Sequence, residues 1–162
     1  MKYTAEFIEL KCWSYYDREC DLIVPNVSYG LLDHEADLIM MSKAGYLSEI
    51  EIKISAGDLK ADVLKRHGHR SNLVKNLYFA IPEKLRKYEV FIPERAGIIT
   101  VPENENNAIT IHRPPVPNKD VKPLTIENRY RLARLGAMRV RGLKIALARY
   151  AEWYAEAKVD AL

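Results

Sequence analysis

The feature that most constrains this chain is a predicted β-hairpin spanning residues 36–53. Two alternating segments are joined by the loop 43–45, which ends in glycine. Three-residue hairpin loops commonly place glycine last, because that position takes the left-handed conformation. If Ser42 then pairs with Tyr46, every other opposed pair in the hairpin follows from that one.

This register places charged side chains together on one face of the hairpin, because side chains alternate across a strand. Asp37 is expected opposite Glu51, with Glu49 and Lys53 on the same face. Opposed carboxylates repel by roughly several tenths of a kcal/mol in a solvated sheet. Lys53 or a divalent metal could compensate them, since hard cations prefer carboxylate oxygens. The alternative is a half-buried hairpin whose outer face is simply charged and solvated. In both cases we expect Asp37 and Glu51 on the solvent side of the hairpin. The opposite, apolar face is the predicted core face and carries Ala36, Leu38, Met40, Ile50, Ile52 and Ile54.

The flanking sequence alternates helical and strand patterns, which predicts an α/β domain with a mixed sheet flanked by helices. Thr4 can cap a helix that runs to about residue 17. Glu6 and Glu9 on this helix could reach a metal if the helix packs against the hairpin, and the alternative is that they are surface acids near a helix start. Ser55 followed by Asp58 has the form of a capping box at the start of a second helix. Pro25 makes the first strand an edge or bulged strand. The strands outside the hairpin are expected at residues 21–28, 76–81, 97–101 and 108–112.

The C-terminal third has a different composition from the rest of the chain. Four prolines make residues 113–123 an extended linker. The segment that follows is helical in pattern, and we expect two helices broken near Gly136 or Gly142. Residues 1–112 hold 14 basic and 17 acidic side chains, whereas residues 113–162 hold 11 and 5. An acidic patch beside a basic arm suits a metal site next to a phosphate-binding surface, although a solvated basic face is the simpler explanation.

Length and composition limit the class of protein. A chain of 162 residues is expected to form one domain with a proper core. No apolar run is long enough to span a membrane, and the N-terminal stretch lacks a secretory pattern. The two cysteines, Cys12 and Cys20, have no metal-type spacing and suggest packing roles in a reducing compartment. The expected location is cytoplasmic, with no membrane partner.

The order of these parts resembles the PD-(D/E)XK nuclease superfamily, in particular its small stand-alone members associated with DNA repair. The residues that carry the resemblance are Asp37 on one strand, E-I-K at residues 51–53 on the next, then S-A-G-D and two apolar strands. The chain departs from the family pattern in having Ala36 before Asp37, and Asn26 where many members carry an acid. The resemblance implies a restriction-endonuclease-like core of αβββαβ order over residues 1–112, the linker 113–123, and a basic helical segment, 124–162, packed on the core.

The resemblance also implies a divalent-metal-dependent endonuclease or exonuclease that hydrolyses DNA phosphodiester bonds in repair or recombination. By this likeness the catalytic residues would be Asp37, Glu51 and Lys53. Mg²⁺ or Mn²⁺ would be held by Asp37, Glu51, the carbonyl of Ile52, and Glu6 on the first helix. Lys53 would orient or deprotonate the attacking water, because a poorly solvated Lys near a metal can lower its pKa. Cutting two strands would favour a homodimer.

Two groups of basic residues are candidates for contact with DNA. The first group follows the second helix and comprises Lys65, Arg66, His67, His69 and Arg70. These cations could instead complement the negative end of the helix dipole. The second group lies in the C-terminal segment and comprises Arg131, Arg134 and Arg141. A catalytically silent nucleic-acid-binding protein of the same fold is the alternative function, and a metal-independent interaction module is a third.

Overall fold

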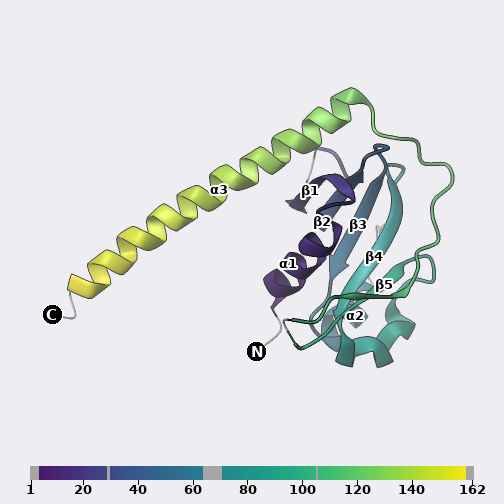
Figure 1. Cartoon of the computed structure of the whole chain (residues 1–162), viewed down its shortest axis with the longest axis horizontal. Coiled ribbons are helices and arrows are strands. Elements are labelled where there is room, and N and C mark those ends of the chain that lie inside the picture. The colour runs from purple at the N-terminus through teal and green to yellow at the C-terminus, as the bar shows by residue number, and fades with distance from the viewer. Residues whose placement is uncertain (1–3, 29, 64–70, 105, 160–162) are drawn as a thin grey trace.

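A computed structural model describes residues 4–28, 30–63, 71–104 and 106–159 of the chain (Figure 1). Within these residues, three α-helices, a 3₁₀ segment and six strands form a mixed α/β fold. The elements in chain order are α1 (Ala5–Tyr16), β1 (Cys20–Val27), β2 (Ala36–Ser42), β3 (Leu47–Ile52), α2 (Ala56–Asp62), β4 (Val74–Pro82), the 3₁₀ segment η1 (Glu83–Phe91), β5 (Gly97–Val101), β6 (Thr110–Arg113) and α3 (Ile126–Val159).

The strands lie side by side in chain order, from β1 at one edge to β6 at the other. β1, β2 and β3 form an antiparallel meander, β4 and β5 run parallel to β3, and β6 is antiparallel to β5. Pro25 lies in the edge strand β1, where its missing N–H costs least, as predicted. The predicted hairpin register is confirmed, because Ile39 pairs with Glu49 and Met40 with Ser48. Gly45 has φ +84°, as its loop position requires.

Short-range side-chain bonds start the helices where the sequence predicted. The Thr4 hydroxyl accepts a hydrogen bond from the Phe7 N–H at 3.1 Å and caps α1. The Ser55 hydroxyl accepts from the Asp58 N–H at 3.2 Å and caps α2. Only Ile54 separates the last hairpin residue, Lys53, from the Ser55 cap, so the hairpin leads directly into α2.

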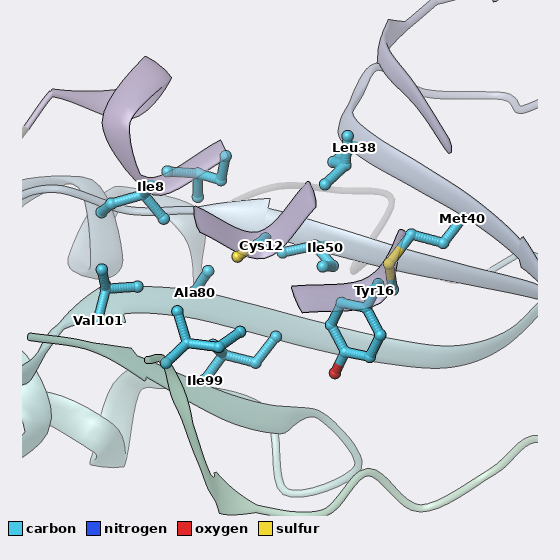
Figure 2. Close-up of a cluster of buried hydrophobic side chains, with 11 residues drawn as sticks. Ile8, Cys12, Tyr16, Leu38, Met40, Ile50, Ala80, Ile99 and Val101 are labelled. Atoms are coloured by element: carbon cyan, nitrogen blue, oxygen red, sulfur yellow. The ribbon is translucent and has the colours of Figure 1, made fainter. Parts of the chain in front are cut away.

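One face of the sheet packs against α1 (Figure 2). Ile8, Cys12 and Tyr16 point from α1 toward Leu38, Met40, Ile50 and Ile99, and this cluster is the expected core face of the hairpin. Burial raises the pKa of the Cys12 thiol to about 12, so this cysteine has the expected packing role. Two members of the predicted core face differ: Ala36 packs in the cluster on the opposite face of the sheet, and Ile54, beyond the end of β3, is 40% exposed.

The expectation of a solvated outer face on the hairpin is wrong. Glu49, Glu51 and Lys53 are all buried, with exposures of 0%, 1% and 7%. This face is covered by two further apolar clusters, one that includes Leu132 and one that includes Leu59. The hairpin is therefore buried on both faces, and Glu49, Glu51 and Lys53 lie inside the protein.

The C-terminal segment forms one helix, α3, where two were expected. A glycine inside a helix costs only about 1 kcal/mol, which a long packed helix can absorb. Gly136 also has a packing role, because a Cβ there would lie 3.4 Å from Val24 Cγ2. The first part of α3 packs across β1 through Leu132, and the remainder projects away from the domain (Figure 1). None of the described helices is long and apolar enough to cross a membrane.

Candidate functional site

The hairpin brings Asp37 against the backbone of the E-x-K segment. Asp37 is half-buried near the start of β2, and its Oδ2 accepts a hydrogen bond from the Ile52 N–H at 2.7 Å. Ile52 lies between Glu51 and Lys53, so this bond joins Asp37 to the strand that carries the other two predicted catalytic residues. An ionised acceptor makes such a bond shorter and stronger than a neutral one.

Lys53 lies between two buried carboxylates. Its Nζ is 2.7 Å from Glu51 Oε2 and 3.1 Å from Asp62 Oδ1. The three side chains are 9%, 2% and 3% exposed. Buried charges are costly unless they are paired, and one cation here offsets two anions. Lys53 therefore provides the compensation expected for the acids of the hairpin, although its second partner comes from α2.

The pKa of Lys53 moves opposite to the expectation for a general base. Burial would lower it, but the charge and hydrogen bond of Glu51 and the charges of Asp62 and Asp37 outweigh burial and raise it. Lys53 is therefore an ammonium group at neutral pH, with N–H bonds available as donors.

A cavity of about 420 Å³ is lined by Asp37 and by Ile52, the residue between Glu51 and Lys53 in the sequence. Its acidic lining comes from two elements, with Glu6 and Glu9 on α1 and Asp37 on β2. Burial raises the pKa of the Glu9 carboxyl, and the nearby charges of Asp37 and Glu6 raise it further. The remaining lining residues come from α1, β1, β3 and α3 and are Ala5, Pro25, Asn26, Ile52, Met138, Arg139, Gly142 and Leu143.

The donor types in this cavity match those that Mg²⁺ and Mn²⁺ take in proteins, namely carboxylate and carbonyl oxygens. Three of the four predicted metal ligands, Glu6, Asp37 and Ile52, line it. The fourth, Glu51, is in the ion pair with Lys53. Among the residues that the structure describes, no group of three or more His, Cys, Asp or Glu side chains is arranged as a ready metal site. The cavity thus offers suitable oxygen donors without a closed ligand cluster.

The predicted DNA-contacting residues fall into two groups. The first lies outside the described residues and comprises Lys65, Arg66, His67, His69 and Arg70. The second, Arg131, Arg134 and Arg141, lies exposed on α3. Arg131 Nη2 is 2.6 Å from Glu127 Oε1 one turn earlier, and Arg131 and Arg134 line a smaller cavity beside Gly30.

Sequence reasoning did not select Asp62 and Arg139 as site residues, whereas it named Glu9, together with Glu6, as an acid that could reach a metal. Asp62, the second partner of Lys53, follows the buried Leu59 by three residues, and this helical spacing places it on the buried face of α2. Glu9 lies one turn after Glu6 on α1 and reaches the same cavity. Arg139 comes from α3, and no local signal distinguishes it from the other arginines there.

A buried pair of His34 and Glu49 was also not predicted. His34 Nε2 lies 2.8 Å from Glu49 Oε1, with the two side chains 3% and 0% exposed. Glu49 was expected on a solvated face, where no partner would be needed. Its burial requires the hydrogen bond that His34 supplies.

Comparison with protein-family models finds no match, and no curated protein matches the chain. Among solved structures, the chain is similar to an SPO1766 protein of unknown function from Silicibacter pomeroyi. The TM-score is 0.65 at 16% sequence identity, over 91% of this chain and 94% of that chain. At this identity the likeness concerns the fold alone. That fold, in the described residues of this chain, is a mixed α/β fold with a six-stranded sheet flanked by helices and a helix at the C-terminal end.

Proposed function

We propose that this chain is a divalent-metal-dependent nuclease that hydrolyses DNA phosphodiester bonds, acting in DNA repair or recombination. The fold supports a restriction-endonuclease-like core, because α1, β1, β2, β3, α2 and β4 follow one another in the αβββαβ order. In the sheet, β1, β2 and β3 form an antiparallel meander and β4 runs parallel to β3.

One observation carries the proposal: the Ile52 N–H donates to Asp37 Oδ2 at 2.7 Å, at the wall of a cavity that Glu6 also lines. An acid held against the E-x-K strand, with a second acid from the first helix, is the arrangement that the resemblance implies. A solvated charged hairpin would need neither the cavity nor the buried Glu51 and Lys53.

The proposed roles follow from the donor types. Asp37, Glu51, the Ile52 carbonyl and Glu6 would hold Mg²⁺ or Mn²⁺. A bound divalent cation lowers the pKa of its water and offsets charge on the phosphate. Hydrolysis forms one bond from the water oxygen to phosphorus and breaks one ester P–O bond, and the leaving oxygen takes up a proton. Lys53 Nζ is held by Glu51 and Asp62, so we assign it the orientation of the water or of a phosphate oxygen by hydrogen-bond donation, and not the removal of a proton.

Nicking of supercoiled plasmid tests the proposal. We expect relaxed circles in Mg²⁺ or Mn²⁺ and none in EDTA. The same preparation of Asp37→Asn serves as the control for a contaminating nuclease. Equal nicking by that variant, or no nicking in either metal, would contradict the proposal. DNA binding without cleavage would instead support a catalytically silent nucleic-acid-binding protein.

The exposed arginines of α3 give a second, independent prediction. Each phosphate contact contributes about 0.9 units to the slope of log affinity against log salt on duplex DNA. Replacing Arg131, Arg134 and Arg141 together by glutamine should therefore reduce the slope by roughly three units. The side chains are exposed, so we expect little change in melting temperature. Fluorescence anisotropy in EDTA at several salt concentrations measures the slope.

A matched triple variant separates a specific surface from net charge. Lys84, Arg86 and Lys87 are exposed on η1, and their replacement by glutamine removes the same number of charges. We expect this triple variant to leave the slope within about one unit of that of the wild type. If both triple variants reduce the salt slope equally, the arginines of α3 do not form a specific interface with DNA.

A further inference from the structure

Helix α3 forms one wall of the acidic cavity. Met138, Arg139, Gly142 and Leu143 line it, as do the carboxylates of α1 and β2. The helix is held there by Leu132, which is fully buried seven residues before Arg139. Seven residues make about two turns, so Arg139 continues the face of α3 that packs on the domain.

The guanidinium of Arg139 is held in place by β1 and the residue that follows it. Its Nη2 donates to the Asn26 carbonyl oxygen and, at 3.3 Å, to Ser28 Oγ. Asn26 has φ +51°, an uncommon conformation that asparagine tolerates better than most residues. Positive φ outside glycine is often found where function requires it.

Arg139 differs in charge from the other residues around the cavity. Among the described lining residues it has the one basic side chain, and the acids Glu6, Glu9 and Asp37 line the same cavity. Its Nε is buried and has no hydrogen-bond partner among those residues. A buried donor without a partner destabilises the protein, and an acceptor on an incoming ligand would remove that penalty.

These observations favour the binding of an anionic group by Arg139 in the acidic cavity. Three carboxylates would repel a phosphodiester, and a guanidinium offers planar N–H donors that match two phosphate oxygens. Gly142, one turn further along α3, leaves open space, because a Cβ built there meets no atom within 4 Å. The opening beside Arg139 is therefore not blocked by the helix that supplies it.

We propose that Arg139 is the residue of α3 that contacts the scissile phosphate in this cavity, which makes α3 part of the active site. The inference rests on the proposed nuclease function. It assigns to the C-terminal helix a role at the reacting group, separate from the exposed arginines that would follow the DNA backbone. The competing explanation is that Arg139 only braces α3 against β1.

Single-turnover cleavage of a DNA substrate distinguishes the two roles. Removing one preorganised donor to a reacting group typically costs 10²–10³ in rate, so we expect Arg139→Gln to cleave at least ~10²-fold more slowly. Its affinity for DNA in EDTA should fall by less than ~10-fold, since one contact among many is lost. Arg86→Gln makes the same chemical change at an exposed position on η1 and should stay within about 3-fold of wild type in rate.

Two more variants separate contact from bracing. Ser28→Ala removes a hydrogen bond to Arg139 but keeps the guanidinium, so it should lower the melting temperature by about 2–4 °C and leave the cleavage rate within about 3-fold of wild type. Arg139→Lys keeps the charge and should be at least ~10-fold faster than Arg139→Gln. A rate loss in Ser28→Ala equal to that of Arg139→Gln, or no gain from lysine, would assign a bracing role and overturn the proposal.

The outcome for the wild-type protein tells the two proposals apart. If it cleaves in Mg²⁺ or Mn²⁺ and Arg139→Gln cleaves as fast as Arg86→Gln, the role of Arg139 is wrong and the nuclease function stands. If the wild type cleaves in neither metal, the proposed function and the role of Arg139 are both overturned.

Discussion

Asp37→Asn is expected to lose metal-dependent DNA cleavage by at least ~10³-fold, about 4 kcal/mol of barrier, and to keep its fold. The amide oxygen can still accept the hydrogen bond from the Ile52 N–H, so the contact between β2 and β3 is retained. The negative charge that would bind Mg²⁺ or Mn²⁺ is lost. The removal of that charge also relieves the repulsion that raises the pKa of Glu9. Single-turnover cleavage and thermal melting in EDTA measure the two effects.

The neighbouring acid Glu35 provides the matched control. It is exposed two residues before Asp37 and does not line the cavity, so Glu35→Gln should cleave within about 3-fold of the wild type. Cleavage by Asp37→Asn at a similar rate would exclude Asp37 as a ligand. A fall in melting temperature of more than about 10 °C, equivalent to several kcal/mol in a chain of this size, would show a mainly structural role.

Lys53→Met is expected to destabilise the protein by about 3–5 kcal/mol, because it leaves two buried carboxylates without their cation. Glu51 Oε2 and Asp62 Oδ1 lie 2.7 and 3.1 Å from the ammonium that would be removed. Each kcal/mol corresponds to about 2–4 °C in a domain of this size, so the melting temperature should fall by roughly 10 °C. Cleavage should be lost as well. Chemical denaturation in EDTA gives the stability change without any contribution from metal.

A double variant tests whether charge pairing is the cause. Replacing Glu51 by Gln in the Lys53→Met background removes one of the stranded charges, so the double variant should be less destabilised than the sum of the two single variants. Lys43→Met, in the exposed hairpin loop, should change stability by less than about 0.5 kcal/mol. Additive effects, or a stable Lys53→Met, would show that the ion pairs contribute little.

The hairpin shows how far local sequence rules reach. The loop 43–45 and the alternation of residues predicted the register, and Ile39 does pair with Glu49. The same alternation predicted a solvated face, which the structure contradicts, since Glu49 and Glu51 are buried. Alternation identifies which side chains share a face, but it does not reveal whether a second layer covers that face.

The helices also show which features depend on local sequence and which depend on tertiary packing. The caps Thr4 and Ser55 were predictable because each hydroxyl bonds an N–H only three residues away. The break expected in the C-terminal segment does not occur, because packing of α3 on β1 outweighs the modest cost of its glycines.

The sequence by itself determined the position of the strands and the register of the hairpin. It also determined that the acids and the lysine of the E-x-K segment share one face, because turns, caps and alternation act over a few residues. Only the tertiary structure decided which of these groups are buried and what they meet. Lys53 finds Asp62 on the next helix, and Arg139 reaches the Asn26 carbonyl across 113 residues of sequence. Such contacts depend on how the layers pack. Packing brings together residues that lie far apart in the chain, and no local sequence pattern marks them as partners.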